Sequence, residues 1–433
     1  MRIEYLNHAS VIIKSGELSL LCDPWFSGTA FAGGWGLQYD NPDALQKARS
    51  CSHLWISHFH GDHLHLQTLK QLAALSPQIK ALANDSVNFR ISEALQHAGF
   101  KNIVPLYERR KLSLTSNMRL TRYPTAGIDN MLLIETPEAR ILNYNDCHLP
   151  IGALKLFMSR IGKVDILLNN FNHAIKFLDN PRKSDEEIQG QLKTNYKKVL
   201  DAINPRWAIP FASAHYYRTR DTQWQNESLL KSDDLVELDS RILPVRVGSE
   251  VTFDDQLQPT LSPPSARVSL NTKDIKLETE SVPFDAVVVA AKDFGKRLRQ
   301  SLLGLTFWIP ELRIRVEEYG RVIRFDVNNQ VFTEAETGDV HIEAHSSALN
   351  QWFRKPYGAD SFFIGGHFAV LSKSTTPIRR VLLACSLMEK RLSPRSLVHY
   401  ALRPGGMKFL LNRREEILVT LFQRRLRVGD RVS

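Results

Sequence analysis

The sequence has few cysteines, and their spacing predicts neither a cross-linked framework nor a small metal-binding module. Four cysteines occur among the 433 residues, at positions 22, 51, 147 and 385, and no two of them form a Cys-x-x-Cys pair. This spacing argues against a disulfide framework and against a zinc ribbon. It is typical of a protein that works in a reducing, cytoplasmic compartment.

Long apolar runs are also missing. No stretch approaches the roughly 20 consecutive apolar residues that a membrane-spanning helix needs. The first residues, Met1 to Tyr5, lead directly into strand-like sequence, without the charged and then apolar pattern of a signal peptide. We therefore expect a cytoplasmic protein, and leave open a peripheral position at the inner face of a membrane.

The chain has no acidic surplus, and its basic surplus is confined to the C-terminal part. The net charge is +10, from 56 Lys and Arg against 46 Asp and Glu. Residues 1–285 hold 32 of each sign, whereas residues 373–433 hold 14 basic and 4 acidic residues. Either this basic end simply keeps the protein soluble, or it meets an anionic partner. A membrane surface is the favoured partner and nucleic acid a less favoured one. Residues 407–427 predict an amphipathic basic helix that lies on a membrane or docks on its own domain.

A dense group of metal-ligand side chains stands between residues 58 and 63. The pattern His-x-His-x-Asp-His comprises His58, His60, Asp62 and His63, and it follows a short apolar stretch that predicts a strand. Alternation along an extended chain places His58 and His60 on one side. A turn at Gly61 and a helix over 64–75 are expected to follow. Two sets of metal ligands are then expected close together, and they could bind two adjacent cations. A histidine-rich surface loop is the alternative, but this spacing after a strand is much more specific.

This motif resembles the signature of the metallo-β-lactamase superfamily of metal-dependent hydrolases and oxidoreductases. Further segments are similar to the metallo-β-lactamase-like part of CMP-N-acetylneuraminate hydroxylases and to related lactonase-like and phospholipase D-like hydrolases. These segments are residues 8–10, 23–26, 30–35, 145–147 and 210–212. The resemblance spans roughly residues 5–220. It implies an α/β fold, the αββα sandwich, which agrees with the strand–helix alternation of this part of the chain.

The resemblance also implies roles for residues outside the motif. Asp146, at the end of a predicted strand, corresponds to a carboxylate that bridges two metals, and His215 to a last histidine ligand. Asp23 corresponds to a carboxylate that supports a ligand histidine from behind. His8 and His173 are candidates for the surroundings of the ligands or of the substrate. Ordinary turn or structural roles remain the alternatives for Asp23, Asp146, His173 and His215.

One histidine that the superfamily usually supplies, just before the strand that begins at Met131, is missing. Either Asp129 replaces it or one metal site is incomplete. A carboxylate is a harder ligand than a histidine. With this ligand, the bound metal could be zinc, iron or manganese. We expect a divalent metal cofactor, as two ions of zinc or iron, with manganese as a further option. The candidate metal ligands are His58, His60, Asp62, His63, Asp129, Asp146 and His215.

The related hydroxylases carry a Rieske iron–sulfur domain, and this chain lacks its ligand pattern. Such a cluster needs two cysteines and two histidines. Cys51 and His53 form the only Cys-x-His pair, and no Cys-x-x-His pair completes the set. A hydroxylase built on this chain would therefore need a separate reductase.

The length predicts two domains. We expect a catalytic domain at 1–255, a linker rich in Pro and Ser at 256–284, and a basic α+β domain at 285–433 that weakly resembles sterol-carrier-like domains. The last domain is expected to hold strands at 313–316, 322–327, 340–344 and 362–371, a helix at 348–353, and a strand or helix start at 287–290.

Together these features predict a metal-dependent hydrolase. A metal-activated water would attack a phosphate ester, lactone or amide of an anionic sugar-linked or lipid-linked substrate. Asp62 and Asp146 are the catalytic candidates, Asp62 as a proton acceptor and Asp146 as the bridging carboxylate. One alternative is a non-haem di-iron oxygenase that acts on a nucleotide-sugar-like substrate. The other is a binding protein with a decayed site and a basic C-terminus that faces a membrane or a partner.

Overall fold

The computed structural model describes residues 1–402 and Leu411, apart from residues 87–88, 126–127, 180, 277–279 and 336–337. Except for Leu411, the basic helix expected over 407–427 lies outside the described residues, and it stays a prediction. Among the residues that are described, no helix combines the length and the apolar character needed to cross a membrane.

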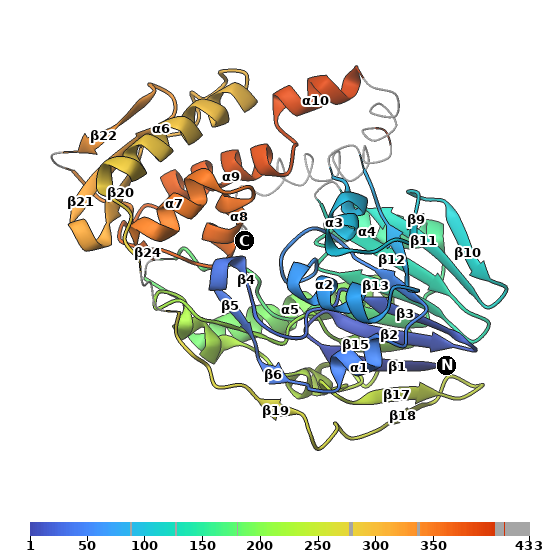
Figure 1. The fold of residues 1–433 in the computed structure, drawn as a ribbon. Helices are drawn as coiled ribbons and strands as arrows, with labels where there is room; N and C mark the ends of the chain where they lie inside the picture. Colours follow the sequence, from blue (N-terminus) through green and yellow to red (C-terminus); the bar gives the residue numbers. More distant parts are fainter. Residues whose placement is uncertain are drawn as a thin grey trace.

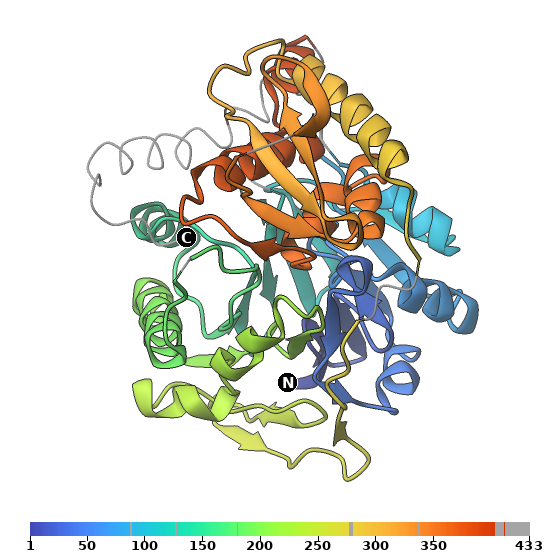
Figure 2. The ribbon, with the colours of Figure 1, turned by 90° about the vertical axis from the view of Figure 1, so that its left-hand side faces the viewer.

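The first part of the chain folds into two sheets that pack face to face, with helices on both outer sides (Figures 1 and 2). The first sheet has the order β18 (Pro259–Leu261), β17 (Glu250–Phe253), β1 (Arg2–Asn7), β2 (Ser10–Ser15), β3 (Leu18–Cys22), β7 (His53–Trp55), β8 (Lys80–Ala83) and β9 (Ile103–Pro105). The second has the order β10 (Lys111–Thr115), β11 (Met118–Pro124), β12 (Asn130–Glu135), β13 (Arg140–Asn145), β14 (Ile166–Asn169) and β15 (Trp207–Pro210).

Helices cover both outer faces because the strands present apolar side chains on both of their sides. Val11 and Ile13 of β2 point into the core between the sheets, whereas Ile12 packs on the outer side. There it meets the layer of α1 (Ala44–Ala48), α2 (Leu66–Leu75) and α3 (Ile91–Ala98). On the second sheet, Leu133 packs outward against the layer of α4 (Ile151–Ile161) and α5 (Asp185–Ile203). Strands with two buried faces need two covering layers, and the predicted αββα sandwich is confirmed.

Parallel pairing directs several strand ends to one edge of the sandwich. Strands β3, β7, β8 and β9 run parallel to one another, and so do β13, β14 and β15. The carboxyl ends of parallel strands meet at the same edge, which is where open α/β sheets bind their ligands. The helix after β7 begins at Leu66, two residues later than expected, because the His65 side chain caps it by accepting from the backbone N–H of Thr68.

Smaller elements surround this edge. One three-stranded sheet joins β16 (His215–Tyr217), β5 (Trp35–Leu37) and β4 (Thr29–Ala30), and the 3-10 helix η1 (Phe31–Gly33) follows β4. A two-stranded ribbon joins β6 (Tyr39–Asp40) and β19 (Ser269–Leu270). The expected linker at 256–284 therefore contributes β18 and β19 to sheets of the first part. Two more 3-10 helices, η2 (Gln223–Ser228) and η3 (Ser232–Leu238), follow β16.

The C-terminal part has its own sheet and its own aromatic-rich core. The strand order is β22 (Val331–Ala335), β21 (Arg321–Asp326), β20 (Leu312–Val316), β23 (Ile342–Ala344) and β24 (Ala369–Val370). The helical elements are α6 (Phe284–Ser301), η4 (Glu317–Tyr319), α7 (Ser346–Arg354), α8 (Gly358–Ile364), α9 (Thr376–Glu389) and α10 (Pro394–Ala401). Three of the expected strands and the expected helix are present, and their ends differ from the expected ones by one or two residues. These are the strands at 313–316, 322–327 and 340–344 and the helix at 348–353. The sterol-carrier-like resemblance stays a prediction.

Two expectations for this part need correction. Residues 287–290 lie inside α6, so the helical alternative holds and the strand is wrong. The strand expected at 362–371 is also wrong, because residues 358–364 form α8 and only Ala369 and Val370 pair as a strand. A short apolar run does not by itself distinguish a strand from a buried helix. Here Phe362 stacks between Trp352 and Phe368, with ring centroids at 4.8 and 5.1 Å, and this packing stabilises the helix.

The C-terminal part docks on the first part through α8, which Figure 1 shows beside β4. The two backbones nearly touch, because a Cβ atom on Gly34 would lie 2.5 Å from the carbonyl oxygen of Gly365. His367 Nε2 lies 2.8 Å from the Phe31 carbonyl oxygen. Tyr357 packs on Phe59, inside the metal-ligand motif, with ring centroids 4.6 Å apart. These contacts place α8 directly over the motif.

A buried lysine at this docking surface provides a test of the fold. Lys176 donates from Nζ to the Asp221 carbonyl oxygen at 2.7 Å, and Nζ lies 5.2 Å from the ring centroid of Phe368. Burial lowers the pKa of Lys176 from 10.5 to about 8. Between these pH values the unfolded chain binds more protons than the folded chain at this residue, so the residue's contribution to stability rises with pH.

We compare the unfolding free energy of wild type with that of a Lys176→Met variant. As the pH rises from 8 to 10.5, we expect this difference to change in favour of wild type. Denaturant unfolding of both proteins at several pH values measures this difference. Lys292→Met, at an exposed position of α6, serves as the control whose difference from wild type stays constant. A pH-independent difference for Lys176→Met would contradict the burial of the charge.

Candidate metal centre

The residues of the motif lie in the connection between β7 and α2, at the carboxyl edge of the sandwich. Asp146 reaches the same edge because it directly follows β13 of the facing sheet. Asp23 reaches it because it directly follows β3. The topology therefore brings together residues that are separated by up to 123 positions in the sequence.

His63 contacts three carboxylates. Its Nε2 atom lies 3.0 Å from Oδ2 of Asp146 and 3.3 Å from Oδ2 of Asp62. Its Nδ1 atom lies 3.2 Å from Oδ2 of Asp23. Asp62 Oδ2 in turn lies 3.1 Å from Nε2 of His8. All of these residues are buried or nearly so, and His63 is at the middle of the group.

A second group forms beside the first around His58. Its Nε2 atom lies 2.9 Å from Nδ1 of His60 and 3.6 Å from Oδ1 of Asp129. Asp129 thus stands next to two motif histidines, in the place where the sequence lacks the usual histidine.

Three sets of side chains could each hold a metal ion, with ligand atoms no more than 4.8 Å apart. The sets are His8, Asp62 and His63; His58, His63 and Asp146; and His58, His60 and Asp129. Each contains two histidines and one carboxylate, and imidazole and carboxylate together suit zinc, iron and manganese. Among the described residues, Asp62 Oδ1 is buried without a hydrogen-bond partner. A donor set of this kind fits a divalent metal.

The protonation states of Asp62 and His58 favour metal binding. Burial alone raises the pKa of Asp62, but contacts with His63 and His8 outweigh it and hold the pKa well below its usual value. Burial and the neighbouring histidines lower the pKa of His58 well below its usual value. At neutral pH the carboxylate is therefore ionised and the imidazole neutral, as metal ligands must be. Burial alone lowers the pKa of His63, but Asp62, Asp146 and Asp23 raise it well above its usual value. A metal would take the place of that proton.

Asp23 holds the surroundings of the ligands together. Its Oδ1 atom accepts from the Ser57 backbone N–H at 2.6 Å, and its Oδ2 atom accepts from Nδ2 of Asn145 at 2.6 Å. The backbone is left-handed at Asp23 and Asn145, and also at His8 and Ala212, with φ between 33° and 55°. These are sharp bends at strand ends, and those at His8, Asp23 and Asn145 place side chains in contact with the ligand group.

His215 and His173 lie differently from the main groups. The His215 ring stacks on Trp35 with centroids 4.0 Å apart and lies 5.4 Å from the His8 ring. It belongs to none of the three sets, although neither of its ring nitrogens has a hydrogen-bond partner in the described part of the chain. His173 is not brought to the centre. Its two ring nitrogens lie 2.7 Å from the Tyr217 hydroxyl and 3.0 Å from Oγ of Ser228.

The structure also places a residue at the centre that sequence reasoning missed. Asp360, from α8 of the C-terminal part, lies with Oδ2 at 3.7 Å from Nε2 of His60. No motif marks this residue, because it is 300 positions from His60 in a region without ligand spacing. Only the docking of α8 on the first part reveals it.

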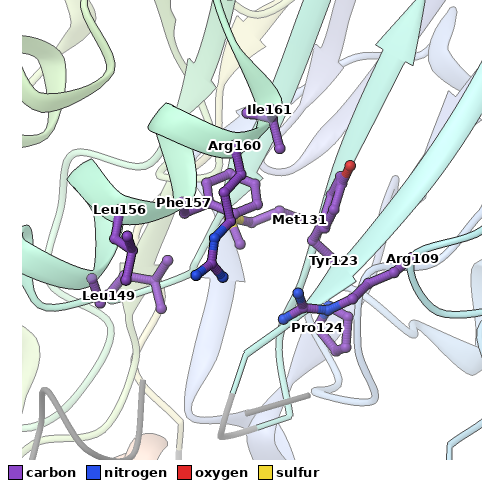
Figure 3. Close-up of a pocket in the computed structure, with 10 residues that line it drawn as sticks. Arg109, Tyr123, Pro124, Met131, Leu149, Leu156, Phe157, Arg160 and Ile161 are labelled. Carbon is purple, nitrogen blue, oxygen red and sulfur yellow. The ribbon is translucent and has the colours of Figure 1, made fainter. Parts of the chain in front are cut away.

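A pocket of about 130 Å³ lies elsewhere, between α4 and the strands β11 and β12 (Figure 3). Its walls are Arg109, Tyr123, Pro124, Met131, Leu149, Ala153, Leu156, Phe157, Arg160 and Ile161. The guanidinium groups of Arg109 and Arg160 point toward it. None of the candidate ligands lines this pocket, and it is separate from the metal-ligand groups.

Comparison with known proteins extends these observations. Residues 2–212 match the family model of the beta-lactamase superfamily domain. The inactive cytidine monophosphate-N-acetylneuraminic acid hydroxylase of Homo sapiens is 29% identical over 251 residues, which cover 54% of this chain and 49% of that protein. The cytidine monophosphate-N-acetylneuraminic acid hydroxylase of Pongo pygmaeus is 29% identical, with 54% and 42% covered. The chain thus spans about half the length, or less, of these curated relatives.

Parts of two solved structures also match this chain. CmlA, a diiron beta-hydroxylase from Streptomyces venezuelae, is 19% identical with a TM-score of 0.38, covering 55% of this chain and 50% of that chain. The isothiocyanate hydrolase from Delia radicum gut bacteria is 13% identical with a TM-score of 0.44, covering 59% of this chain and 100% of that chain. The family model, the sandwich and the ligand motif agree: residues 2–212 belong to the metallo-β-lactamase superfamily of metal-dependent enzymes.

Proposed function

We propose that the chain is a non-haem iron oxygenase that hydroxylates an anionic organic substrate at this centre. The observation that carries the proposal is the composition of the three ligand sets, each with two histidines and one carboxylate. This combination, with open coordination positions, is typical of non-haem iron(II) oxygenases. Asp129 strengthens it, because a carboxylate stands beside His58 where the superfamily usually has a histidine.

The curated relatives support the same class of reaction. The regions that match are parts of proteins named as hydroxylases of a cytidine monophosphate sugar acid. Such a substrate is an anion, and Lys390 adds positive charge at the site. It acts electrostatically on His58 in the β7–α2 connection, on Asp129 just before β12, and on Asp360 in α8. We propose that Lys390 attracts the anionic part of the substrate.

Bound iron would supply the activation of O2 for insertion into a C–H bond. The residues of the chain prepare the site for it. Asp23 fixes the ring of His63, and Trp35 covers His215 and excludes water from that side. Hydroxylation turns one oxygen atom into the product hydroxyl and the other into water, so it consumes two electrons and two protons. The four cysteines are buried, and in this proposal a separate reductase delivers the electrons.

Hydrolysis is the second candidate function, and one observation favours it. Asp62 Oδ1 is buried beside the ligands without a hydrogen-bond partner among the described residues. A carboxylate oxygen in this position is suited to accept a proton from a metal-activated water. The substrate would then be a phosphate ester, lactone or amide of a sugar-linked or lipid-linked compound.

Metal analysis combined with oxygen uptake separates the two functions. We expect the purified protein to bind iron, and the iron-loaded protein to consume O2 with ascorbate as reductant in the presence of cytidine monophosphate sugar acids. His58→Ala is expected to abolish this uptake. Zinc binding without oxygen uptake, together with cleavage of a phosphodiester or lactone, would replace the first proposal by the second. A protein that binds neither metal contradicts both.

A further inference from the structure

We infer that Asp360 is a positioning residue of the metal centre, supplied by the C-terminal part of the chain. Its carboxylate accepts the Nε2–H of His60 and thereby directs Nδ1 of the same ring toward the metal. The inference rests on the proposed function only in requiring that His60 binds a metal. It extends the centre beyond residues 2–212, which carry the superfamily match.

The orientation of the His60 ring assigns a role to each nitrogen. Nδ1 lies 2.9 Å from Nε2 of His58, so it faces the other ligands. Nε2 points the opposite way, toward Oδ2 of Asp360 at 3.7 Å. In the described part of the chain, neither of these two atoms has a hydrogen-bond partner, and both are buried. Two buried polar atoms of complementary kind thus face each other, slightly beyond the usual limit of about 3.2 Å for an N–H···O bond. Closing this gap needs the two atoms to approach by about 0.5 Å.

Asp360 is itself held firmly. The Glu389 carboxylate at the end of α9 accepts from the backbone N–H groups of Ala359 and Asp360, both at 2.9 Å. On the preceding side, a Cβ atom on Gly358 would lie 2.3 Å from the Gln351 carbonyl oxygen, so α8 is pressed against α7. Asp360 is 5% exposed. Its position relative to His60 is therefore determined by how α8 docks.

The same arrangement occurs within the first part of the chain. Asp23 faces Nδ1 of His63 at 3.2 Å, while Nε2 of His63 faces the Asp146 carboxylate. Metal-binding histidines commonly donate their second N–H to a carboxylate, which fixes the tautomer and the ring orientation. Asp360 would do for His60 what Asp23 does for His63. One ligand histidine is then supported from the end of β3 and the other from α8.

An Asp360→Asn variant of the full chain tests the inference, because it keeps the size of the side chain and removes its charge. We expect its affinity for cobalt(II), measured by competition with a chelator, to fall by about 10–100-fold. The visible absorption of the cobalt(II)-loaded protein should also change, since the ring of a ligand is reoriented. Asp360→Glu, which keeps the charge, should recover part of both. If the asparagine variant does not fold, Asp360→Glu is compared with wild type instead, and its spectrum must differ from that of wild type.

Asp326→Asn is the matched control. Asp326 is a buried carboxylate of the same part of the chain, and it accepts from the backbone N–H and Nδ2 of Asn329 away from the ligands. This variant should lose stability and keep the metal affinity and spectrum of wild type. Unchanged affinity and spectrum in Asp360→Asn would overturn the inference, while loss of metal in His58→Ala would still uphold the metal centre. Retention of the full wild-type metal content by His58→Ala would instead overturn the proposed function, because His58 belongs to two of the three ligand sets.

Discussion

Replacing His63 with alanine is expected to remove metal from two of the three ligand sets, since both contain this residue. At most one ion should remain, at His58, His60 and Asp129, and activity should fall by at least about 100-fold. Three carboxylates would also lose one buried partner, and breaking a buried ion pair by removing one partner costs about 3–5 kcal/mol. Elemental analysis and thermal unfolding with and without added metal measure the two effects.

His173→Ala is the control for this experiment. His173 is also buried, and its ring nitrogens are engaged by Tyr217 and Ser228 rather than by the ligand sets. The variant should lose stability and keep the metal content of wild type. A His63→Ala protein that still binds two ions per chain would show that the centre is built differently.

A methyl group at Gly34 is expected to disturb the docking of the two parts of the chain. The added Cβ atom would lie 2.5 Å from the Gly365 carbonyl oxygen and 2.6 Å from its Cα atom. Both are backbone atoms and cannot move aside alone, so α8 must shift. Overpacking of this kind costs about 1–3 kcal/mol or more, and the shift also carries Asp360 away from His60. Denaturant unfolding and metal affinity of Gly34→Ala check the two consequences.

Gly190→Ala provides the opposite control. Gly190 lies on an exposed face of α5, and an added Cβ atom would meet nothing within 4 Å. Alanine is a better helix former than glycine by about 1 kcal/mol, so this variant should be slightly more stable than wild type. Equal stability of the two alanine variants would contradict the close approach of Gly34 and Gly365.

The first half of the chain could be predicted well from the sequence because its signals are local. The motif from His58 to His63 has its ligands within six residues, and the strands around it alternate or run apolar as buried strands do. Asp129 and Asp146 are predicted as ligands from the resemblance to the metallo-β-lactamase superfamily, which places ligands beside the strands next to them. Their contacts with His58 and His63 follow from the topology of the sandwich.

The C-terminal contribution could not be predicted, for physical reasons. Residues 358–364 are apolar and short, and a pattern of this length fits a strand as well as a helix. The helix exists because Phe362 fits into an aromatic core assembled from residues far apart in the chain. Asp360 then reaches His60 only through a tertiary contact between two parts of the chain. The spacing of residues in the sequence does not predict such a contact.

The left-handed strand ends around the ligands have an energetic consequence. Non-glycine residues in this conformation cost about 1–3 kcal/mol each, and His8, Asp23, Asn145 and Ala212 all adopt it. Hydrogen bonds hold the backbone in these bends. The Asp23 carboxylate accepts from Ser57 and Asn145, and the His8 carbonyl oxygen accepts from the Ala212 N–H. The strain is therefore stored in the folded protein before any ion arrives. Because the bends are already made, a metal finds its ligands in place and loses little affinity to their ordering.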